Sequence, residues 1–284
     1  MSPDPSSDHV AQCAMLAMLF ELSSSPKPGN VDRCHDFSDI GFHHFLTSAV
    51  SAYPVFRKAA QGKGSVGSLI LEGVSAWQTW NLSSNTHFGS LVLMIPIAIA
   101  ARRPGKLQAE LADVLEKTTA IDAIDFYCAF EKAKARVAEV DNFSLNDKNW
   151  QKTVSESGNT LLDLMRLSSK HDIVAREWST NYERSFLLAD RLAEKVDRLG
   201  LNDGVVRTFL EALAEVPDSL ICAKFGDEKA RQVSEQAGEA LLDVTLGKAR
   251  ELDCDLLAQD INPGSTADLI AASLFISLLM GLRF

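Results

Sequence analysis

Apolar residues recur at every third or fourth position along most of the chain, a spacing that puts them on one face of an α-helix. In residues 9–22, the positions that share this spacing are Val10, Cys13, Ala14, Ala17, Met18 and Glu21. The same pattern predicts helices over residues 42–60, 66–80, 87–101, 107–117, 121–138, 149–169, 173–199, 205–214, 227–246 and 266–281. Alternating apolar and polar stretches bounded by turns, which would indicate strands, are essentially missing. The pattern therefore predicts an all-α fold.

The length of 284 residues suits one large domain or two small ones. The best candidate boundary is the polar stretch 141–148, which is short enough to be a loop inside one domain. No repeat of fixed period divides the chain. We expect a single globular multi-helix domain over residues 1–284.

Composition narrows the class of protein. Hydrophobic residues make up 46% and charged residues 23%, and the formal net charge of -10 argues against binding to duplex nucleic acid or anionic membranes. The most apolar runs, 91–101 and 269–282, are shorter than the ~20 residues of a membrane-spanning helix. The five cysteines are scattered without a CxxC pair, which indicates reduced, buried thiols in a cytoplasmic protein. The oligomeric state stays open, a homo-oligomer included.

Three polar segments rich in Gly or Pro each lead into an apolar helix: residues 23–33, 81–89 and 260–268. The start of a helix presents unpaired N–H groups and a partial positive charge, so it can hold phosphate. Together with nearby Lys, Arg, His and carboxylates, the three segments indicate a nucleotide site if they converge. The alternative is that they are ordinary caps and turns.

The first segment contains the sequence Pro26-Lys27-Pro28-Gly29. The prolines fix φ, and Gly29 permits a positive φ or a close approach to a ligand. Lys27 therefore lies on a stiff connector, which suits a phosphate-binding lysine as well as a solvated one. Glu21 precedes the segment on the core-facing stripe of its helix. A buried carboxylate must be paired or coordinated, so metal, Lys27 and Arg33 are its candidate partners.

Asp36 and Asp39 follow three residues apart and would share one side of a helical turn. Two carboxylates with one open side commonly hold Mg²⁺, which keeps several waters and bridges to phosphates. The alternative is an acidic helix N-terminus that complements the helix dipole.

The second and third segments offer caps and polar donors. Ser84, Asn85 or Thr86 can cap a helix that opens at His87, with His87 in its first turn, and Asn85 and His87 offer donors to phosphate oxygens or a departing base. In the third segment, Pro263 and Gly264 set a turn, Ser265 or Thr266 is the expected cap, and Asp268 could complete a variant capping box.

Arg176 belongs to a fourth cluster of charged residues, which also contains His171, Asp172 and Glu177. Asp172 and Arg176 are four residues apart and could form a surface ion pair, whereas a contact between Arg176 and a substrate phosphate is the functional alternative. The sequence contains no GxxxxGK[ST] phosphate loop, no GxGxxG after a strand, no HExxH and no GxSxG motif. An ATP site in this chain would belong to a different design.

Taken together, the segments resemble the triphosphoribosyl-dephospho-CoA synthase family. The resemblance rests on Glu21 with residues 25–33, on Asn85-Thr86-His87-x-Gly89, on residues 160–165, and on residues 262–269. They occur in the family's order and span residues 21 to about 280. Departures at residues 130–142 and 171–177 mark the chain as a divergent member.

The resemblance implies a transferase that joins ATP to the 2′-hydroxyl of 3′-dephospho-CoA and releases adenine. Such a reaction needs cationic groups on the triphosphate, a base for the hydroxyl proton and a carboxylate near the developing oxocarbenium ion. The candidate residues are Glu21, Asp36, His87 and Asp268 for catalysis, Asp36 and Asp39 for Mg²⁺, and Lys27, Gly29, Arg33, Asn85, Thr86, Arg176, Gly264 and Ser265 for nucleotide binding. The alternatives are the same ribosyl chemistry on another cofactor precursor, or a non-catalytic helical protein that binds a nucleotide.

Overall fold

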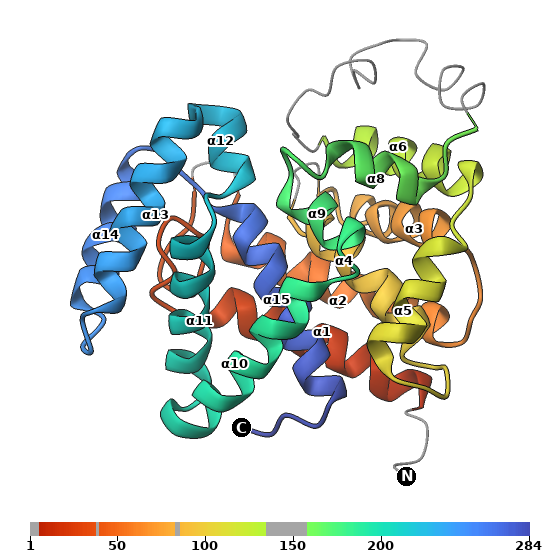
Figure 1. The fold of residues 1–284 in the computed structure, drawn as a ribbon, viewed down its shortest axis with the longest axis horizontal. Helices are drawn as coiled ribbons and strands as arrows, with labels where there is room; N and C mark the ends of the chain where they lie inside the picture. Colours follow the sequence, from red (N-terminus) through yellow and green to blue (C-terminus); the bar gives the residue numbers. More distant parts are fainter. Residues whose placement is uncertain (1–5, 38–39, 83–85, 135–157) are drawn as a thin grey trace. The chain divides into compact units, whose positions relative to one another are not determined.

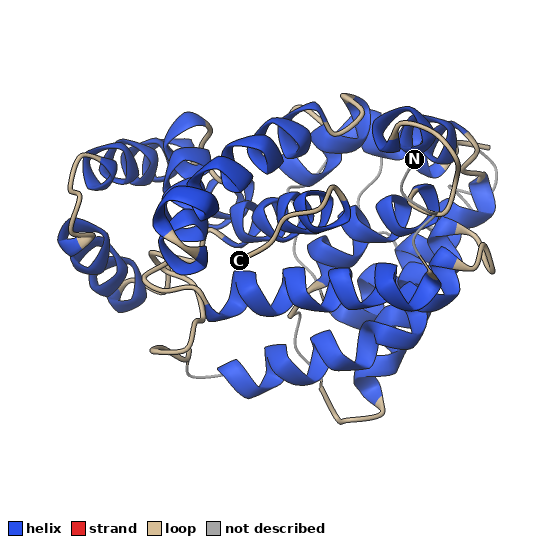
Figure 2. Cartoon of the chain, turned by 90° about the horizontal axis from the view of Figure 1, so that it is seen from below, coloured by secondary structure: helices blue, strands red, loops and turns tan. Residues whose placement is uncertain are grey.

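The computed structural model describes residues 6–37, 40–82, 86–134 and 158–284. Within these ranges the regular structure is helical, apart from one isolated antiparallel bridge between Asp32 and His35, which confirms the all-α prediction (Figure 2). The chain divides into two compact units (Figure 1). One contains residues 1–15 and 47–183, and the other contains residues 16–46 and 184–284. A single domain over residues 1–284 stays a prediction.

The first unit is built around helix α4 (Phe88–Ala100). Every α4 residue except the half-exposed Gly89 is buried, as expected for a helix that is apolar on all sides. It packs against α3, α5 and α9. The other helices of this unit are the start of α1 (Ser7–Ser23), α2 (Phe42–Ala60), α3 (Val66–Gln78), α5 (Leu107–Glu116), α6 (Ala120–Ala133), α8 (Leu161–Ser168) and α9 (Ile173–Ser179).

Helices α3 and α6 approach closely at Gly67. A Cβ at this position would lie 2.3 Å from the carbonyl oxygen of Asp122, so only glycine fits. The Gly67 N–H donates to Asp122 Oδ1 at 2.8 Å, while Asp122 also completes a capping box with Thr119 at the start of α6. The Asp122 carboxylate thus both starts its own helix and fixes the neighbouring one.

The second unit contains the end of α1 with α10 (Glu183–Leu199), α11 (Leu201–Glu215), α12 (Ser219–Phe225), α13 (Asp227–Leu241), α14 (Gly247–Ala258) and α15 (Gly264–Leu279). The apolar helix α15 is largely buried and packs against α11 and α12. Helix α13 packs against α11, α12 and α14, so α14 is attached to this unit through α13.

Several predicted helix boundaries are confirmed and others are wrong. The prediction for residues 42–60 coincides with α2, whereas the single helix predicted over residues 173–199 is two helices. Asn181 and Tyr182 break it with positive φ values of 53° and 59°. Helices α12 and α14 are not among the predicted ones. In the part of 149–169 that the structure describes, the helix begins only at Leu161, because Thr160 caps it.

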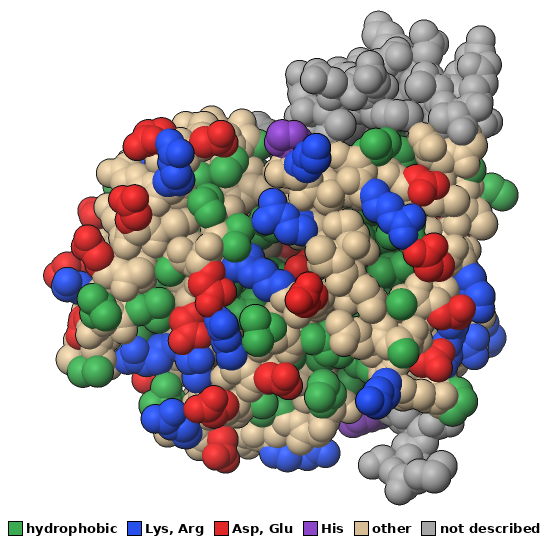
Figure 3. Space-filling view, viewed as in Figure 1, with side chains coloured by type: hydrophobic (Ala, Val, Ile, Leu, Met, Phe, Trp, Pro, Cys, Tyr) green, Lys and Arg blue, Asp and Glu red, His purple; other side chains and the backbone are tan. Residues whose placement is uncertain are grey.

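Acidic and basic side chains are interspersed over the face drawn in Figure 3, with hydrophobic side chains between them. None of the helices in the described ranges is long and apolar enough to cross a membrane.

Candidate functional site

The Pro-Lys-Pro-Gly segment forms a tight turn in the second unit. The Asn30 N–H donates to the Lys27 carbonyl at 3.0 Å, and Gly29 has a φ of +73°. Proline followed by a glycine with positive φ is the usual pair at the centre of a type II turn. The positive φ predicted for Gly29 is therefore confirmed.

Gly29 also brings the first and third polar segments together. A Cβ at Gly29 would lie 2.3 Å from the carbonyl oxygen of Ile261, which leaves room for glycine alone. The Gly29 N–H donates to Asp253 Oδ1 on α14 at 2.9 Å. The close approach predicted for Gly29 is thus made to the chain's own backbone, and residues 23–33 and 260–268 lie side by side in one unit.

Glu21 and Lys27 form a buried ion pair at the end of α1. Lys27 is 1% exposed and its Nζ donates to Glu21 Oε1, so the expectation that a buried Glu21 must be paired is confirmed. Burial raises the pKa of Glu21, the Lys27 ammonium lowers it, and the nearby Asp32 carboxylate raises it again. The Lys27 ammonium is therefore already paired with a carboxylate of the chain. A direct contact between Lys27 and phosphate stays a prediction.

Asn202, at the start of α11, holds the same segment by its backbone. Its Oδ1 accepts from the Ser25 N–H at 3.1 Å and its Nδ2 donates to the Ser25 carbonyl at 2.9 Å. The exposed guanidinium of Arg33 also donates to Asn202 Oδ1, at 3.0 Å. One amide therefore fixes both the loop backbone and the cation that follows it.

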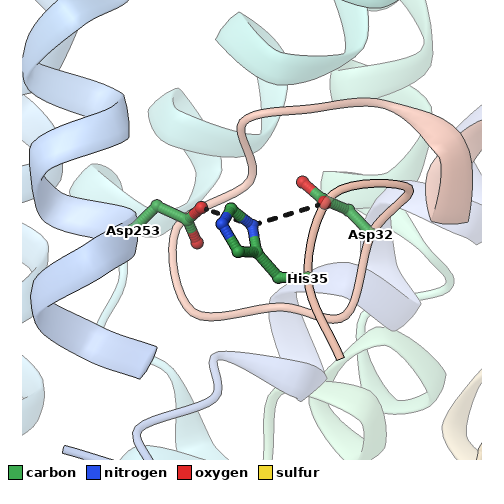
Figure 4. Close-up of side chains that lie close together, drawn as sticks. All are labelled: Asp32, His35 and Asp253. Atoms are coloured by element: carbon green, nitrogen blue, oxygen red, sulfur yellow. Dashed lines mark ion pairs between the residues drawn. The ribbon is translucent and has the colours of Figure 1, made fainter. Parts of the chain in front are cut away.

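Asp32, His35 and Asp253 lie together beside this loop (Figure 4). His35 Nδ1 is 3.1 Å from Asp253 Oδ2 and 3.6 Å from Asp32 Oδ1. Both carboxylates are buried, while the imidazole is 38% exposed. Burial raises the pKa of Asp253, the Gly29 N–H and His35 lower it, and Asp32 raises it. This cluster contains the residue types that hold a divalent cation, and sequence reasoning did not single it out.

The predicted pair of carboxylates at Asp36 and Asp39 is described only in part. Asp36 is exposed and lies in a loop rather than on a helical turn, so the predicted helical geometry is wrong. Its Oδ1 accepts from the N–H of Phe42, the first residue of α2, at 2.6 Å. This contact agrees with the alternative of a carboxylate at a helix N-terminus. Asp39 lies outside the described residues, and the metal role of both stays a prediction.

Helix α15 has an unexpected cap. It begins at Gly264, and Pro263 rather than Ser265 or Thr266 occupies the N-cap position, so the predicted cap is wrong. Asp218, which itself caps α12, accepts from the Thr266 N–H at 2.7 Å and from the Thr266 hydroxyl at 2.8 Å. Ser265 interacts with Ser219 through their hydroxyl groups at 3.0 Å. Asp268 is half-buried in the second turn of the helix.

Asp218 is completely buried between these two helix starts. Desolvation raises its pKa to about 6, against the hydrogen bonds from Thr266, Ile221 and Leu220, which lower it. The carboxylate is thus held by four donors and still protonates more readily than an ordinary aspartate.

The second polar segment belongs to the first unit. Helix α4 begins at Phe88, so His87 is the N-cap residue and not part of the first turn as predicted. His87 is buried, with Nδ1 2.6 Å from the Ser48 hydroxyl. Thr86 is half-buried beside it, and Asn85 lies outside the described residues. The convergence of His87 with the other two segments stays a prediction.

Arg176 occupies α9 in the first unit. Its guanidinium donates to the carbonyl oxygens of Ser169 at 3.2 Å and Lys170 at 3.5 Å, just beyond the end of α8. A cation at a helix C-terminus stabilises the helix dipole. These contacts give Arg176 a structural role, and its contact with phosphate stays a prediction.

Three residues that hold the second unit's loops together were missed by sequence reasoning: Asn202, Asp218 and Asp253. The position of Asp253, however, could have been recognised from the sequence. It shares an i, i+3, i+4, i+7 stripe with Ala249, Leu252 and Leu256, so an acidic residue stands at a core-facing helical position. Asn202 and Asp218 are polar residues at helix starts, and nothing in their local sequence indicates partners far along the chain.

Comparison with known proteins gives matches along almost the whole chain. A protein-family model described as ATP:dephospho-CoA triphosphoribosyl transferase matches residues 7–283. A protein of Streptococcus equi named as a 2-(5″-triphosphoribosyl)-3′-dephosphocoenzyme-A synthase is 23% identical, with 96% of this chain and 97% of the relative covered. A relative of the same name from Pseudomonas fluorescens is 27% identical, with 97% and 93% covered.

A solved structure is also similar. The crystal structure of a triphosphoribosyl-dephospho-CoA synthase candidate from Archaeoglobus fulgidus matches with a TM-score of 0.73 and 28% identity, and the match covers 85% of this chain and all of that one. This similarity agrees with the resemblance that the polar segments indicated. The chain belongs to the ATP:dephospho-CoA triphosphoribosyl transferase family.

Proposed function

We propose that this chain transfers the 5-triphosphoribosyl group of ATP to the 2′-hydroxyl of 3′-dephospho-CoA and releases adenine. The observation that carries the proposal is the family match over residues 7–283, with relatives named for this activity that cover nearly all of the chain. The product would be a precursor of a prosthetic group, and the enzyme would be a transferase of cofactor biosynthesis.

The reaction exchanges one bond at an anomeric carbon for another. The bond between C1′ of the ATP ribose and N9 of adenine breaks, and a bond from C1′ to the acceptor's 2′-oxygen forms. The hydroxyl proton passes to a base, and the departing adenine takes up a proton. Positive charge develops on the ribose as the first bond weakens, so a carboxylate nearby stabilises the transition state.

Arg33 is the residue of the first segment that we assign to a phosphate group. Its guanidinium is exposed, while Asn202 fixes its position, so it could bind an incoming anion without first leaving the protein interior. A planar guanidinium also matches phosphate geometry through paired hydrogen bonds. We assign the Glu21–Lys27 ion pair to positioning of the loop that carries Arg33, because both side chains are buried.

The exposed carboxylate of Asp36 is the candidate base or metal ligand of this loop, and His87 and Asp268 stay candidates from the other two segments. Mg²⁺ as the partner of the triphosphate, and a cytoplasmic location, likewise remain predictions. Mg²⁺ would neutralise charge on the phosphate oxygens and fix their orientation.

The test incubates the purified chain with ATP, Mg²⁺ and 3′-dephospho-CoA and measures adenine and the coupled product by chromatography with mass detection. We expect both in equal amounts. Adenine without the coupled product would favour a different acceptor, and unchanged ATP with measurable binding would favour a nucleotide-binding protein without activity.

A pair of arginine variants tests the assignment of Arg33. Arg33→Ala should raise the KM for ATP at least ~10-fold, the effect of losing a charge-assisted pair with phosphate. Arg198→Ala, which removes an exposed arginine of α10 in the same unit, is the matched control and should leave the KM unchanged. Equal behaviour of the two variants would remove Arg33 from the site.

A further inference from the structure

The Asp32 carboxylate has one oxygen that the described residues leave unused. Its Oδ1 accepts from the Cys34 N–H at 2.7 Å. Its Oδ2 is buried and accepts no hydrogen bond within the ranges that the structure describes. Asp32 is 1% exposed, so bulk water does not replace the missing partner. A buried carboxylate oxygen without a partner is costly, and a bound cation is one of the few groups that would satisfy it.

Among the buried side chains around Asp32, acidic groups also outnumber cationic ones. Three buried carboxylates, those of Glu21, Asp32 and Asp253, lie close enough to influence one another, as the effects of Asp32 on the pKa values of the other two indicate. The buried cation beside them is Lys27, whose Nζ is bonded to Glu21. Asp32 and Asp253 therefore face each other across the His35 imidazole, with no buried cation of their own among the described residues.

The spacing of the three side chains fits the edges of a metal coordination shell. Ligand atoms about 2.0 to 2.2 Å from a metal, with angles between 90° and 110°, lie about 2.8 to 3.6 Å apart. His35 Nδ1 lies 3.1 Å from Asp253 Oδ2 and 3.6 Å from Asp32 Oδ1, the oxygen on the same carboxylate as the unused Oδ2. One possible ligand atom from each of the three residues lies within 4.8 Å of the others. Both carboxylates point toward the imidazole between them (Figure 4).

The cluster is held in place by groups that would not compete with a cation. Asp253 uses Oδ1 for the Gly29 N–H and directs Oδ2 to His35. The backbone bridge between Asp32 and His35 fixes the loop on which these two ligands lie. The two remaining carboxylate oxygens and the imidazole nitrogen thus form a preorganised donor set.

We propose that Asp32, His35 and Asp253 bind one divalent cation. Two carboxylates neutralise its charge, and one imidazole with two carboxylate oxygens is a donor set that suits Mn²⁺ better than Mg²⁺, which prefers oxygen ligands alone. Three protein ligands leave coordination positions for water or for phosphate oxygens. The inference differs from the metal site predicted at Asp36 and Asp39, and it does not depend on the proposed transfer reaction.

The experiment titrates the metal-free full-length chain with Mn²⁺ and follows the loss of the free-ion signal by electron paramagnetic resonance. The wild-type chain should bind one Mn²⁺, and Mg²⁺ should displace it only in large excess. Asp253→Asn keeps an oxygen for the Gly29 N–H but removes a charged ligand, and it should weaken Mn²⁺ binding at least ~10-fold. His35→Gln should have a comparable effect at a half-exposed position that tolerates change.

Asp255→Asn is the matched control, because Asp255 is an exposed aspartate on the same helix, and it should bind Mn²⁺ like the wild type. Circular dichroism of each variant measures its helical content and so shows whether weaker binding comes from the loss of a ligand or from unfolding. The proposal would be overturned if the wild-type chain binds no Mn²⁺, or if neither Asp253→Asn nor His35→Gln weakens binding. It would also be overturned if Asp36→Asn abolishes binding and His35→Gln does not. Adenine release is measured separately, so failure of the metal site and failure of the proposed function are distinguishable.

Discussion

The Asp253 carboxylate on α14 accepts a 2.9 Å hydrogen bond from the backbone N–H of Gly29, a residue 224 positions earlier in the chain. This bond attaches the Pro-Lys-Pro-Gly turn to a helix from the far end of the sequence. A charged acceptor makes the bond stronger than one between neutral groups. The turn that carries Lys27 and precedes Arg33 is therefore a fixed part of the second unit.

Replacing Gly29 should disturb this attachment. Gly29→Ala places a Cβ 2.3 Å from the Ile261 carbonyl at a φ of +73°, so we expect the free energy of unfolding to fall by at least about 2 kcal/mol. The measurement is urea unfolding followed by circular dichroism.

Gly238→Ala is the control for this substitution. Gly238 lies inside α13, where the nearest atom to an added Cβ is 3.8 Å away, so alanine should stabilise the chain by up to about 1 kcal/mol. A Gly29→Ala variant as stable as the wild type would contradict the close approach to Ile261.

Asp218 should make stability depend on pH. Its pKa is about 6 in the folded chain and close to 3.8 when unfolded, so between these values the folded chain keeps a proton that the unfolded chain has lost. The free energy of unfolding should therefore fall as the pH rises from about 4 to about 6, by on the order of 3 kcal/mol, and this contribution should then level off.

The variant Asp218→Asn should lack this slope because it does not titrate, and the difference between its pH profile and that of the wild type isolates the effect. Asp190→Asn removes an exposed carboxylate from α10 and should reproduce the wild-type profile. Parallel profiles for wild type and Asp218→Asn would show that burial does not control this carboxylate.

The Glu21–Lys27 pair should show strong coupling. Either Glu21→Gln or Lys27→Met leaves one buried group without its charged partner, and each should lower the free energy of unfolding by about 3 to 5 kcal/mol. The double variant buries no unpaired charge and should lose clearly less than the sum of the two. Additive losses in this double-mutant cycle, measured by urea unfolding, would argue against a direct interaction.

The helical fold could be predicted because apolar spacing is a local property of the sequence. The positive φ of Gly29 and the pairing of Glu21 also follow from local rules, since a glycine after proline marks a turn and a carboxylate on an apolar stripe needs a partner. The break at Asn181 and Tyr182 could not be predicted in this way. Neither residue ends a helix by itself, and their left-handed backbone depends on the surrounding structure.

The candidate site was predictable only where the signal was local. The segment around Lys27 stood out by its prolines and glycine, whereas Asp32 and His35 gained significance only through Asp253, which lies on a helix that the sequence pattern did not predict. The caps of α15 show the same limit. Ser265 and Thr266 fit a local capping rule, but Asp218 from another helix supplies the acceptor.

The most direct test of the proposed function is a single reaction with ATP carrying a label in its ribose, 3′-dephospho-CoA and the purified chain. The account predicts that the ribose label moves onto the dephospho-CoA product while one adenine is released for each product formed, and that Arg33→Ala slows both at low ATP concentration. Labelled ribose that stays in ATP, or free adenine with no label on dephospho-CoA, would contradict it.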